Sequence, residues 1–204
     1  MKETTHKQAW YVINGITLYR IVAAPILLLL VFSGDLEIFK WLLGISFFTD
    51  LIDGFLARRF KVASVLGTRL DSIGDDLTVL VGVIALFVTK MEFIKEQKFI
   101  FILLLLLFLA QTTYAFIRYG KITNFHTWLA KTAALLQGVF LLLAFFTDEP
   151  NLVLFYTAAL ITMLELIEEI ILVRLLPNWE TNVQGIYWVL KKKEKRKINS
   201  KTAQ

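Results

Sequence analysis

Four aspartates are spaced as helix neighbours in two successive apolar segments of the chain. Asp50 and Asp53 are three residues apart and Asp71 and Asp75 are four apart, so each pair lies on one helix face. Carboxylates so close repel each other, and an aspartate inside an apolar helix is costly. Mg²⁺, Mn²⁺ or Ca²⁺ would bind the carboxylate oxygens and relieve both costs. Two such ions shared by the four aspartates would suit in-line displacement at a phosphorus atom.

The residues beside these aspartates are suited to a phosphate-bearing substrate. Gly54 and Ala57 remove bulk from the aspartate face, and Gly67 does the same at the start of the next segment. Arg58 offers a planar guanidinium that can bind two phosphate oxygens at once. A cation pathway would use the carboxylates but gives no reason for the arginine or the small residues. The pattern therefore favours phosphoryl chemistry over ion transport.

The elements that carry these residues have the composition of membrane spans. Of the 204 residues, 57% are hydrophobic, 19% are charged and none is cysteine, and the mean hydropathy is +0.64. This excludes a disordered chain, disulfides and thiol nucleophiles, and disfavours an ordinary soluble enzyme. Because a spanning helix needs about 20 apolar residues, we predict an all-α integral membrane bundle of six transmembrane helices. The predicted helices cover Trp10–Phe32, Leu36–Leu56, Leu66–Thr89, Phe99–Ile117, Ile122–Phe146 and Leu152–Leu175.

Charges in the connections predict how this bundle is oriented. Lysines and arginines gather at both termini and at every second connection, and the positive-inside rule places that side in the cytoplasm. We therefore expect a multi-pass protein of an inner, cytoplasmic membrane, with both termini and the aspartate site facing the cytoplasm. The chain would then consist of a membrane domain over residues 1–176 and a basic juxtamembrane tail over residues 177–204.

The tail combines aromatic and basic residues. Trp179, Tyr187 and Trp188 precede the basic run Lys191–Lys197, in a chain with a net charge of +5 and a pI of 9.4. Beside long apolar runs, this distribution predicts a membrane surface as partner and not a nucleic acid. We interpret the tail as an amphipathic segment on the anionic cytoplasmic leaflet. A disordered solubilising tail is the alternative beyond Lys193.

The aspartate pattern resembles a known signature. The chain has Asp50-x-x-Asp53-Gly54-x-x-Ala57-Arg58, eight further residues, and then Gly67-x-x-x-Asp71-x-x-x-Asp75. This is similar to the motif of the class I CDP-alcohol phosphatidyltransferases, which include the phosphatidylglycerophosphate and phosphatidylinositol-phosphate synthases. Every fixed position is filled at the family's spacing, and six spans match the family's core. In the first span, Asn14, Thr17 and Arg20 are similar to the start of many members.

The resemblance implies roles for the matching residues. Two divalent ions, Mg²⁺ or Mn²⁺, would be held by Asp50, Asp53, Asp71 and Asp75. Asp75 would also act as the catalytic base. The CDP-lipid would contact Thr17, Gly54, Arg58 and Ser64. Many members have a lysine directly after the last aspartate, where this chain has Asp76, so the surroundings of Asp75 are more negative here.

The resemblance also implies a reaction. An alcohol hydroxyl would attack the diacylglycerol-linked phosphorus of CDP-diacylglycerol and release CMP, and Asp75 would take the hydroxyl proton. The favoured acceptor is glycerol 3-phosphate, because cations near the cytoplasmic end could bind its phosphate. The candidate acceptor residues are Arg118, Lys121 and Lys131, with His126 nearby. The positive-inside rule alone would also place the first two there.

Three glutamates of the last span have no place in the motif. Glu165, Glu168 and Glu169 share one helix face. We expect them to neutralise Arg20 and Lys131. The alternative is that they bind a cationic acceptor, such as serine or an ethanolamine head group.

Other functions stay open. The donor could be CDP-choline or CDP-ethanolamine, with diacylglycerol as acceptor. A different class is a cation transporter that uses the aspartates as a transit site. A third possibility is a catalytically inactive membrane scaffold, which the complete motif disfavours. A homodimer is compatible with the resemblance.

Overall fold

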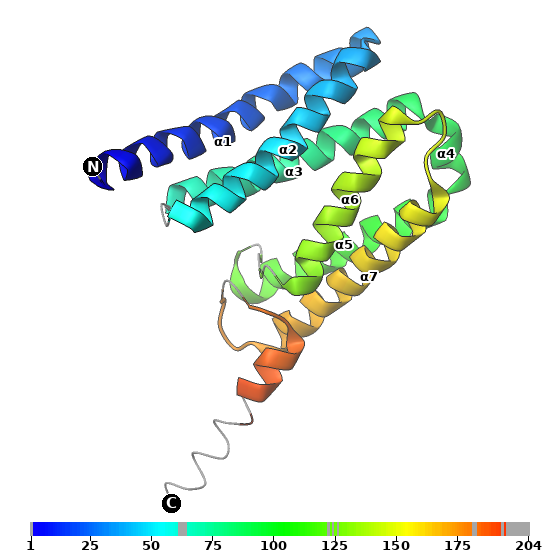
Figure 1. Cartoon of the computed structure of the whole chain (residues 1–204). Coiled ribbons are helices and arrows are strands. Elements are labelled where there is room, and N and C mark those ends of the chain that lie inside the picture. Colours follow the sequence, from blue (N-terminus) through cyan, green and yellow to red (C-terminus); the bar gives the residue numbers. More distant parts are fainter. Residues whose placement is uncertain are drawn as a thin grey trace, which may run out of the picture. The chain divides into compact units, whose positions relative to one another are not determined.

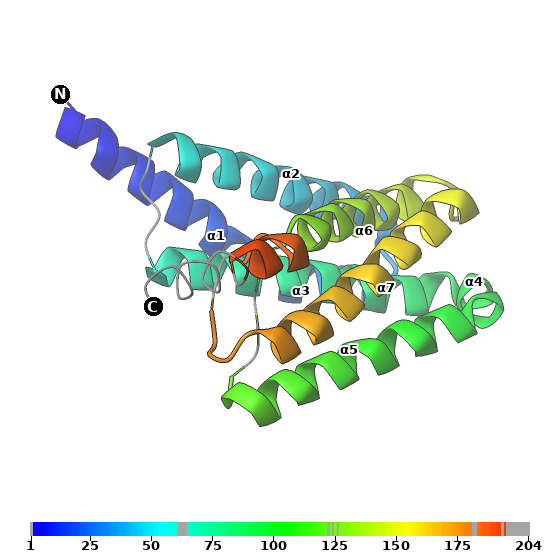
Figure 2. The same cartoon turned by 90° about the horizontal axis from the view of Figure 1, so that it is seen from below.

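The computed structural model describes residues 2–60, 65–121, 123, 125, 127–180, 183–192 and 194. Within these ranges, the side chains at 2–14, 16, 17, 50, 51, 53–60, 65–73, 75 and 76 lie outside the description. The described chain contains the seven labelled helices of Figures 1 and 2, a further helical segment at 186–192, and no strand. The predicted all-α class is confirmed. The helices divide between two compact units.

The first unit comprises residues 1–95 and 138–151 and is built around α1 (Lys2–Ser33). This helix packs along both α2 (Leu36–Phe60) and α3 (Val65–Thr89), and the short α4 (Met91–Glu96) follows α3. The buried core residues are Ala24, Leu27, Val31, Phe39, Leu43, Val81 and Ala85. Inside a bilayer such a core stabilises mainly through close packing, because lipid tails are as apolar as the side chains.

The second part of α6 (Trp128–Phe146) also belongs to the first unit. Gly82 of α3 lets this helix come close, because a Cβ there would lie 3.1 Å from a methyl carbon of Leu141. Just after α3, the ammonium of Lys90 donates hydrogen bonds to the main-chain carbonyls of Thr147 and Asp148. The end of α6 is thus tied to the end of α3 by both packing and hydrogen bonds.

The second unit comprises residues 96–137 and 152–204. In it, α5 (Lys98–Tyr119) packs against α7 (Leu152–Leu175). The buried residues of this core are Ala115, Phe125, Leu172, Val173, Leu176, Val183 and Val189. Residues well beyond the end of α7 therefore take part in the core of this unit.

Two helices, α5 and α6, are long and apolar enough to cross a membrane, judged over the described residues. The corresponding apolar stretches of α1 and α3 are shorter there, at Leu18–Ser33 and Leu77–Thr89. Most leucine and phenylalanine side chains of α5 are exposed, which is unfavourable in water and favourable in lipid. These features indicate a membrane protein.

The predicted helix Ile122–Phe146 begins only at Trp128, so its predicted start was wrong. The Thr127 hydroxyl accepts a hydrogen bond from the N–H of Ala130 at 3.0 Å, which is a helix N-cap. The side chains of Thr127 and Phe125 are both fully buried. Tertiary packing therefore holds the described residues ahead of the capped helix, Thr123, Phe125 and Thr127, in a non-helical conformation. The other five predicted helices are present.

Gly120 ends α5 in the left-handed conformation, with φ 65° and ψ 16°, and its N–H donates to the carbonyl of Phe116 at 2.8 Å. Because a Cβ is strained in this region, we expect Gly120→Ala to lower the free energy of unfolding by about 1 kcal/mol. The measurement is Tm in detergent. Gly15→Ala is the matched control, since Gly15 lies inside α1 with open space around it. Equal Tm values for the two variants would contradict this account of the helix end.

Candidate functional site

The four aspartates of the motif lie at matching levels of α2 and α3. Asp50 stands ten residues before the end of α2, and Asp75 stands ten residues after the start of α3. At the rise of an α-helix, both are about 15 Å from the helix ends that residues 61–64 connect. Asp53 and Asp71 are both about 10 Å from those ends by the same count. Figure 1 shows these two ends at the same end of the first unit.

The helical backbone predicted for each aspartate pair is confirmed. The carboxylates of the four aspartates are not among the side chains that the structure describes. Among the side chains that the structure does describe, no three acidic or histidine groups are placed to hold a metal ion. The donor chemistry of the motif nevertheless fits one, because carboxylate oxygens on neighbouring helices are the ligands that Mg²⁺ and Mn²⁺ prefer.

Arg20 of α1 is buried against the aspartate-bearing stretch of α3. Its side chain is only 1% exposed, and a Cβ on Gly74 would lie 3.4 Å from its Nε atom. Gly74 stands between Asp71 and Asp75 in the sequence, so a guanidinium lies beside the backbone of the motif. A buried guanidinium needs anionic or carbonyl acceptors. Arg20 therefore lies beside the aspartate motif, a placement that the sequence alone did not predict.

The predicted CDP-lipid contacts are less fully described. Thr17 lies in α1, and Gly54 and Arg58 lie in α2 after Asp53. The side chains of Thr17 and Arg58 are outside the description, and Ser64 lies outside the described residues altogether. Gly54 and Arg58 are four residues apart on one helix, so they share a face. Their assignment to the nucleotide stays a prediction.

The predicted acceptor cations make local contacts in the second unit. Arg118 donates a hydrogen bond to the carbonyl of Leu176 at 3.2 Å, and the ammonium of Lys121 lies 5.1 Å from the ring centre of Trp179. The ammonium of Lys131 lies 5.0 Å from the ring centre of Trp128. Arg118 and Lys121 therefore connect the end of α5 to the chain after α7. His126 lies outside the described residues.

The expected pairing of Lys131 with the glutamates of α7 was wrong. Within the described residues no ion pair joins them. Glu169 instead accepts hydrogen bonds from the Gln111 amide and the Thr123 hydroxyl, all three side chains being buried. Glu168 accepts one from the main-chain N–H of Ile186 at 3.2 Å. The hydrogen bonds to these two carboxyl groups come from neutral donors and not from a lysine. The predicted pairing with Arg20 stays a prediction.

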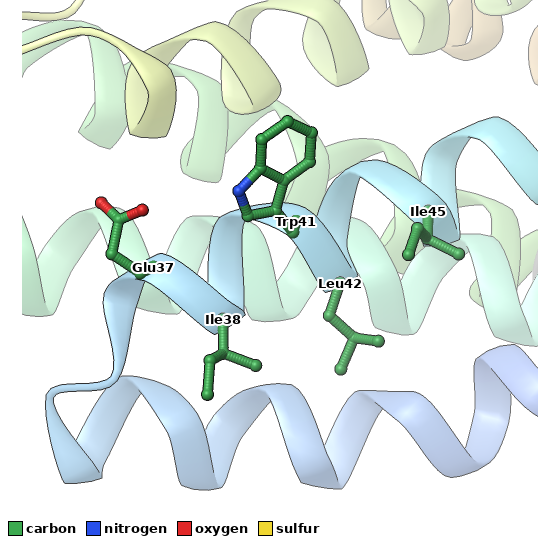
Figure 3. Close-up of a pocket in the computed structure, with 5 residues that line it drawn as sticks. All are labelled: Glu37, Ile38, Trp41, Leu42 and Ile45. Carbon is green, nitrogen blue, oxygen red and sulfur yellow. The ribbon is translucent and has the colours of Figure 1, made fainter.

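A shallow groove on α2 is not part of this site. Four apolar side chains and Glu37 line it (Figure 3), and all belong to the first half of the helix. Trp41, in its middle, stands twelve residues from Asp53, which is about 18 Å along the helix axis. Its apolar lining suits lipid chains better than phosphate chemistry.

Comparison with known proteins places this site in a family context. A family model described as CDP-alcohol phosphatidyltransferase matches residues 10–171. The human cardiolipin synthase (CMP-forming) is 30% identical over 82 residues, which are 40% of this chain and 27% of that protein. The rat protein of the same name is 30% identical over 84 residues, 41% of this chain and 28% of its own. The chain thus aligns with little more than a quarter of these curated relatives. No solved structure matches.

Proposed function

The chain belongs to the CDP-alcohol phosphatidyltransferase family, and we propose that it transfers the phosphatidyl group of CDP-diacylglycerol to glycerol 3-phosphate with release of CMP. It is a transferase of substituted phosphate groups. The observation that carries the proposal is the complete aspartate motif on two packed helices, with both pairs at matching levels. Both relatives are described as CMP-forming, which supports CMP as the product released.

The motif assigns a place to each part of the donor. Arg58 would hold the diphosphate of the CDP-lipid, and Gly54, one turn earlier, would let the nucleotide approach the helix backbone. Thr17 and Ser64 would complete the contacts to CDP. The diacylglycerol chains would stay in the bilayer, which explains why apolar helices carry the site.

The aspartates would hold the metal ions and move the proton. Asp50, Asp53, Asp71 and Asp75 would coordinate two divalent ions. Such ions, when bound, neutralise diphosphate charge and stabilise the departing CMP. Asp75 would accept the proton of the acceptor hydroxyl. The hydroxyl oxygen would form a bond to the phosphorus atom as the bond from that phosphorus to the CMP oxygen breaks. Arg20 brings a buried positive charge to the stretch of α3 beside Asp75.

We also propose six membrane spans, with both termini in the cytoplasm and the site facing it. Cations at the ends of α5 and α7 support this orientation. Lys90 fits the charge rule least, because it lies on the opposite side of the predicted bundle. Its ammonium is engaged by the carbonyls that follow α6, so a structural role accounts for its position.

A second candidate is the synthesis of cardiolipin, with phosphatidylglycerol as the accepting alcohol. The names of the two relatives favour it. It is also consistent with the contacts of Arg118 and Lys121, which connect the end of α5 to the chain after α7. Because both cations have these contacts, neither needs to be assigned to the phosphate of a soluble acceptor. In this case the acceptor would reach the site from within the bilayer.

The deciding experiment offers CDP-diacylglycerol and Mg²⁺ to the purified protein with a panel of alcohols. The panel contains glycerol 3-phosphate, an inositol phosphate, serine and phosphatidylglycerol, and mass spectrometry identifies the lipid made. Phosphatidylglycerophosphate would support the first proposal and cardiolipin the second. A parallel reaction offers CDP-choline and diacylglycerol instead; phosphatidylcholine formed there, with no lipid product from CDP-diacylglycerol, would refute both proposals.

Lys131 tests the acceptor pocket. If its ammonium binds the phosphate of glycerol 3-phosphate, Lys131→Ala should raise the acceptor KM about tenfold or more, because a charged hydrogen bond is lost. The KM for CDP-diacylglycerol should hardly change. Lys131→Arg, which keeps the charge above the Trp128 ring, is the matched control and should restore most of the affinity. Small and equal effects on both KM values would assign Lys131 to the packing of α6 alone.

A further inference from the structure

The chain beyond α7 folds back onto the second unit as a segment that we call the docked segment, residues 183–192. Val183 and Val189 are each 7% exposed and belong to the same core as Ala115 of α5 and Leu172 of α7. The carbonyl of Gln184 accepts a hydrogen bond from the N–H of Trp128 at 3.3 Å. The segment is therefore held by apolar packing on two helices and by the first residue of a third.

Glu168 and Gly185 fix the docked segment to α7. The Glu168 carboxylate accepts the N–H of Ile186 at 3.2 Å. Gly185 has a φ of 143°, and a Cβ at this position would lie only 3.0 Å from the Glu168 Oε1 atom. Any other residue would be strained there and would push the carboxylate away. The contact therefore depends on glycine.

Docking leaves an aromatic and basic face exposed. Tyr187, Trp188 and Leu190 are 64%, 45% and 49% exposed, and they precede Lys191 and Lys192. The rings of Tyr187 and Trp188 meet edge to face at 5.5 Å, and the Lys191 ammonium lies 5.6 Å from the Tyr187 ring centre. Aromatic rings beside lysines on a short helix are typical of segments that lie in the headgroup region of a membrane.

The exposed face belongs to the end of the second unit where cations gather. Arg118 lies in the last turn of α5, Lys121 directly follows the Gly120 cap of that helix, and Arg174 lies in the last turn of α7. Lys192 is offset by Glu180 at 3.7 Å, and both side chains are largely exposed. The remaining positive charges complement an anionic surface, and each lysine near such a surface strengthens binding about fivefold.

We propose that the exposed face of the docked segment binds anionic lipid headgroups. Val183 and Val189 hold the segment to the second unit, while Trp188 and Leu190 enter the headgroup region. The lysines make the contact sensitive to lipid charge. The residues of this surface are not those of the aspartate motif, and the proposal does not depend on which alcohol the enzyme uses.

The natural chain has no cysteine, so Leu190→Cys gives a single reactive position on this face. The protein is placed in nanodiscs of phosphatidylcholine alone or mixed with phosphatidylserine, without nucleotide, and the rate of reaction with a water-soluble maleimide is measured. We expect reaction to be at least about fivefold slower in the anionic discs. The difference should disappear when Lys191→Gln and Lys192→Gln are added, and at high salt.

Val189→Cys is the matched control, because this neighbour faces the core and should react slowly in both kinds of disc. Adding Gly185→Ala should make that cysteine reactive, which shows that docking hides it. Equal reaction rates for Leu190→Cys in the two kinds of disc would overturn the proposal. Protection seen only in discs loaded with two copies would also overturn it, since a second copy would then cover the face.

Discussion

Replacing Asp75 with asparagine is expected to lower kcat for CMP release by about 10²–10⁴-fold, the usual contribution of a general base. Asparagine has nearly the same size but cannot accept the proton of the acceptor hydroxyl. The position lies in α3, ten residues from its start and next to Gly74, where Arg20 is buried. The variant is assayed in detergent with CDP-diacylglycerol and the acceptor that the panel identifies.

Asp76→Asn is the matched control for this variant. It makes the same change of charge one residue later, about 100° around the helix, and removes an aspartate where many members of the family have lysine. We expect its rate to stay within a fewfold of the natural chain. Circular dichroism and Tm should show both variants folded. A folded Asp75→Asn protein with undiminished CMP release would remove the proposed base.

Removal of divalent ions is expected to abolish activity. After treatment with EDTA, CMP release should fall by at least about 10³-fold, because the charge stabilisation that is lost amounts to several kcal/mol. Mg²⁺ or Mn²⁺ should restore it. Full activity in the chelated protein would refute the metal proposal.

Direct binding separates the metal site from the chemistry. Titration of the protein with Mn²⁺, followed by electron paramagnetic resonance, should show tight binding that Asp53→Asn and Asp71→Asn each weaken. These two positions lie at the same level of α2 and α3. Unchanged Mn²⁺ affinity in both variants would place the ions elsewhere. Flux of Mn²⁺ across vesicles without CDP-lipid turnover would instead support the transporter.

Much of the helical fold could be predicted because local sequence patterns indicate which segments form helices. The spacing of the aspartates predicts helices there, and both pairs lie in helices, Asp50 and Asp53 in α2 and Asp71 and Asp75 in α3. The true start of α6 also had a local signal, since Thr127 is a good N-cap residue. That signal was masked by the apolar residues before it, among them Phe125, which a tertiary core buries.

The partners of the charged groups could not be predicted from spacing. Glu169 finds Gln111 and Thr123, which stand far from it in the sequence. Lys131 lies over Trp128, only three residues away. Opposite charge alone led to the prediction that Glu169 and Lys131 would form an ion pair. Which neutral groups a carboxyl group meets depends on how helices pack, and opposite charges are only one way to satisfy it.

The docked segment determines how far the chain can be shortened from its C-terminus. A chain that stops after Leu176 would lose Val183 and Val189, leave Leu172 uncovered and deprive Glu168 of its amide partner. A chain that stops after Lys192 would keep all of these contacts. Tags for purification therefore belong after that lysine, and earlier stop codons should yield protein that is poorly extracted and prone to aggregate.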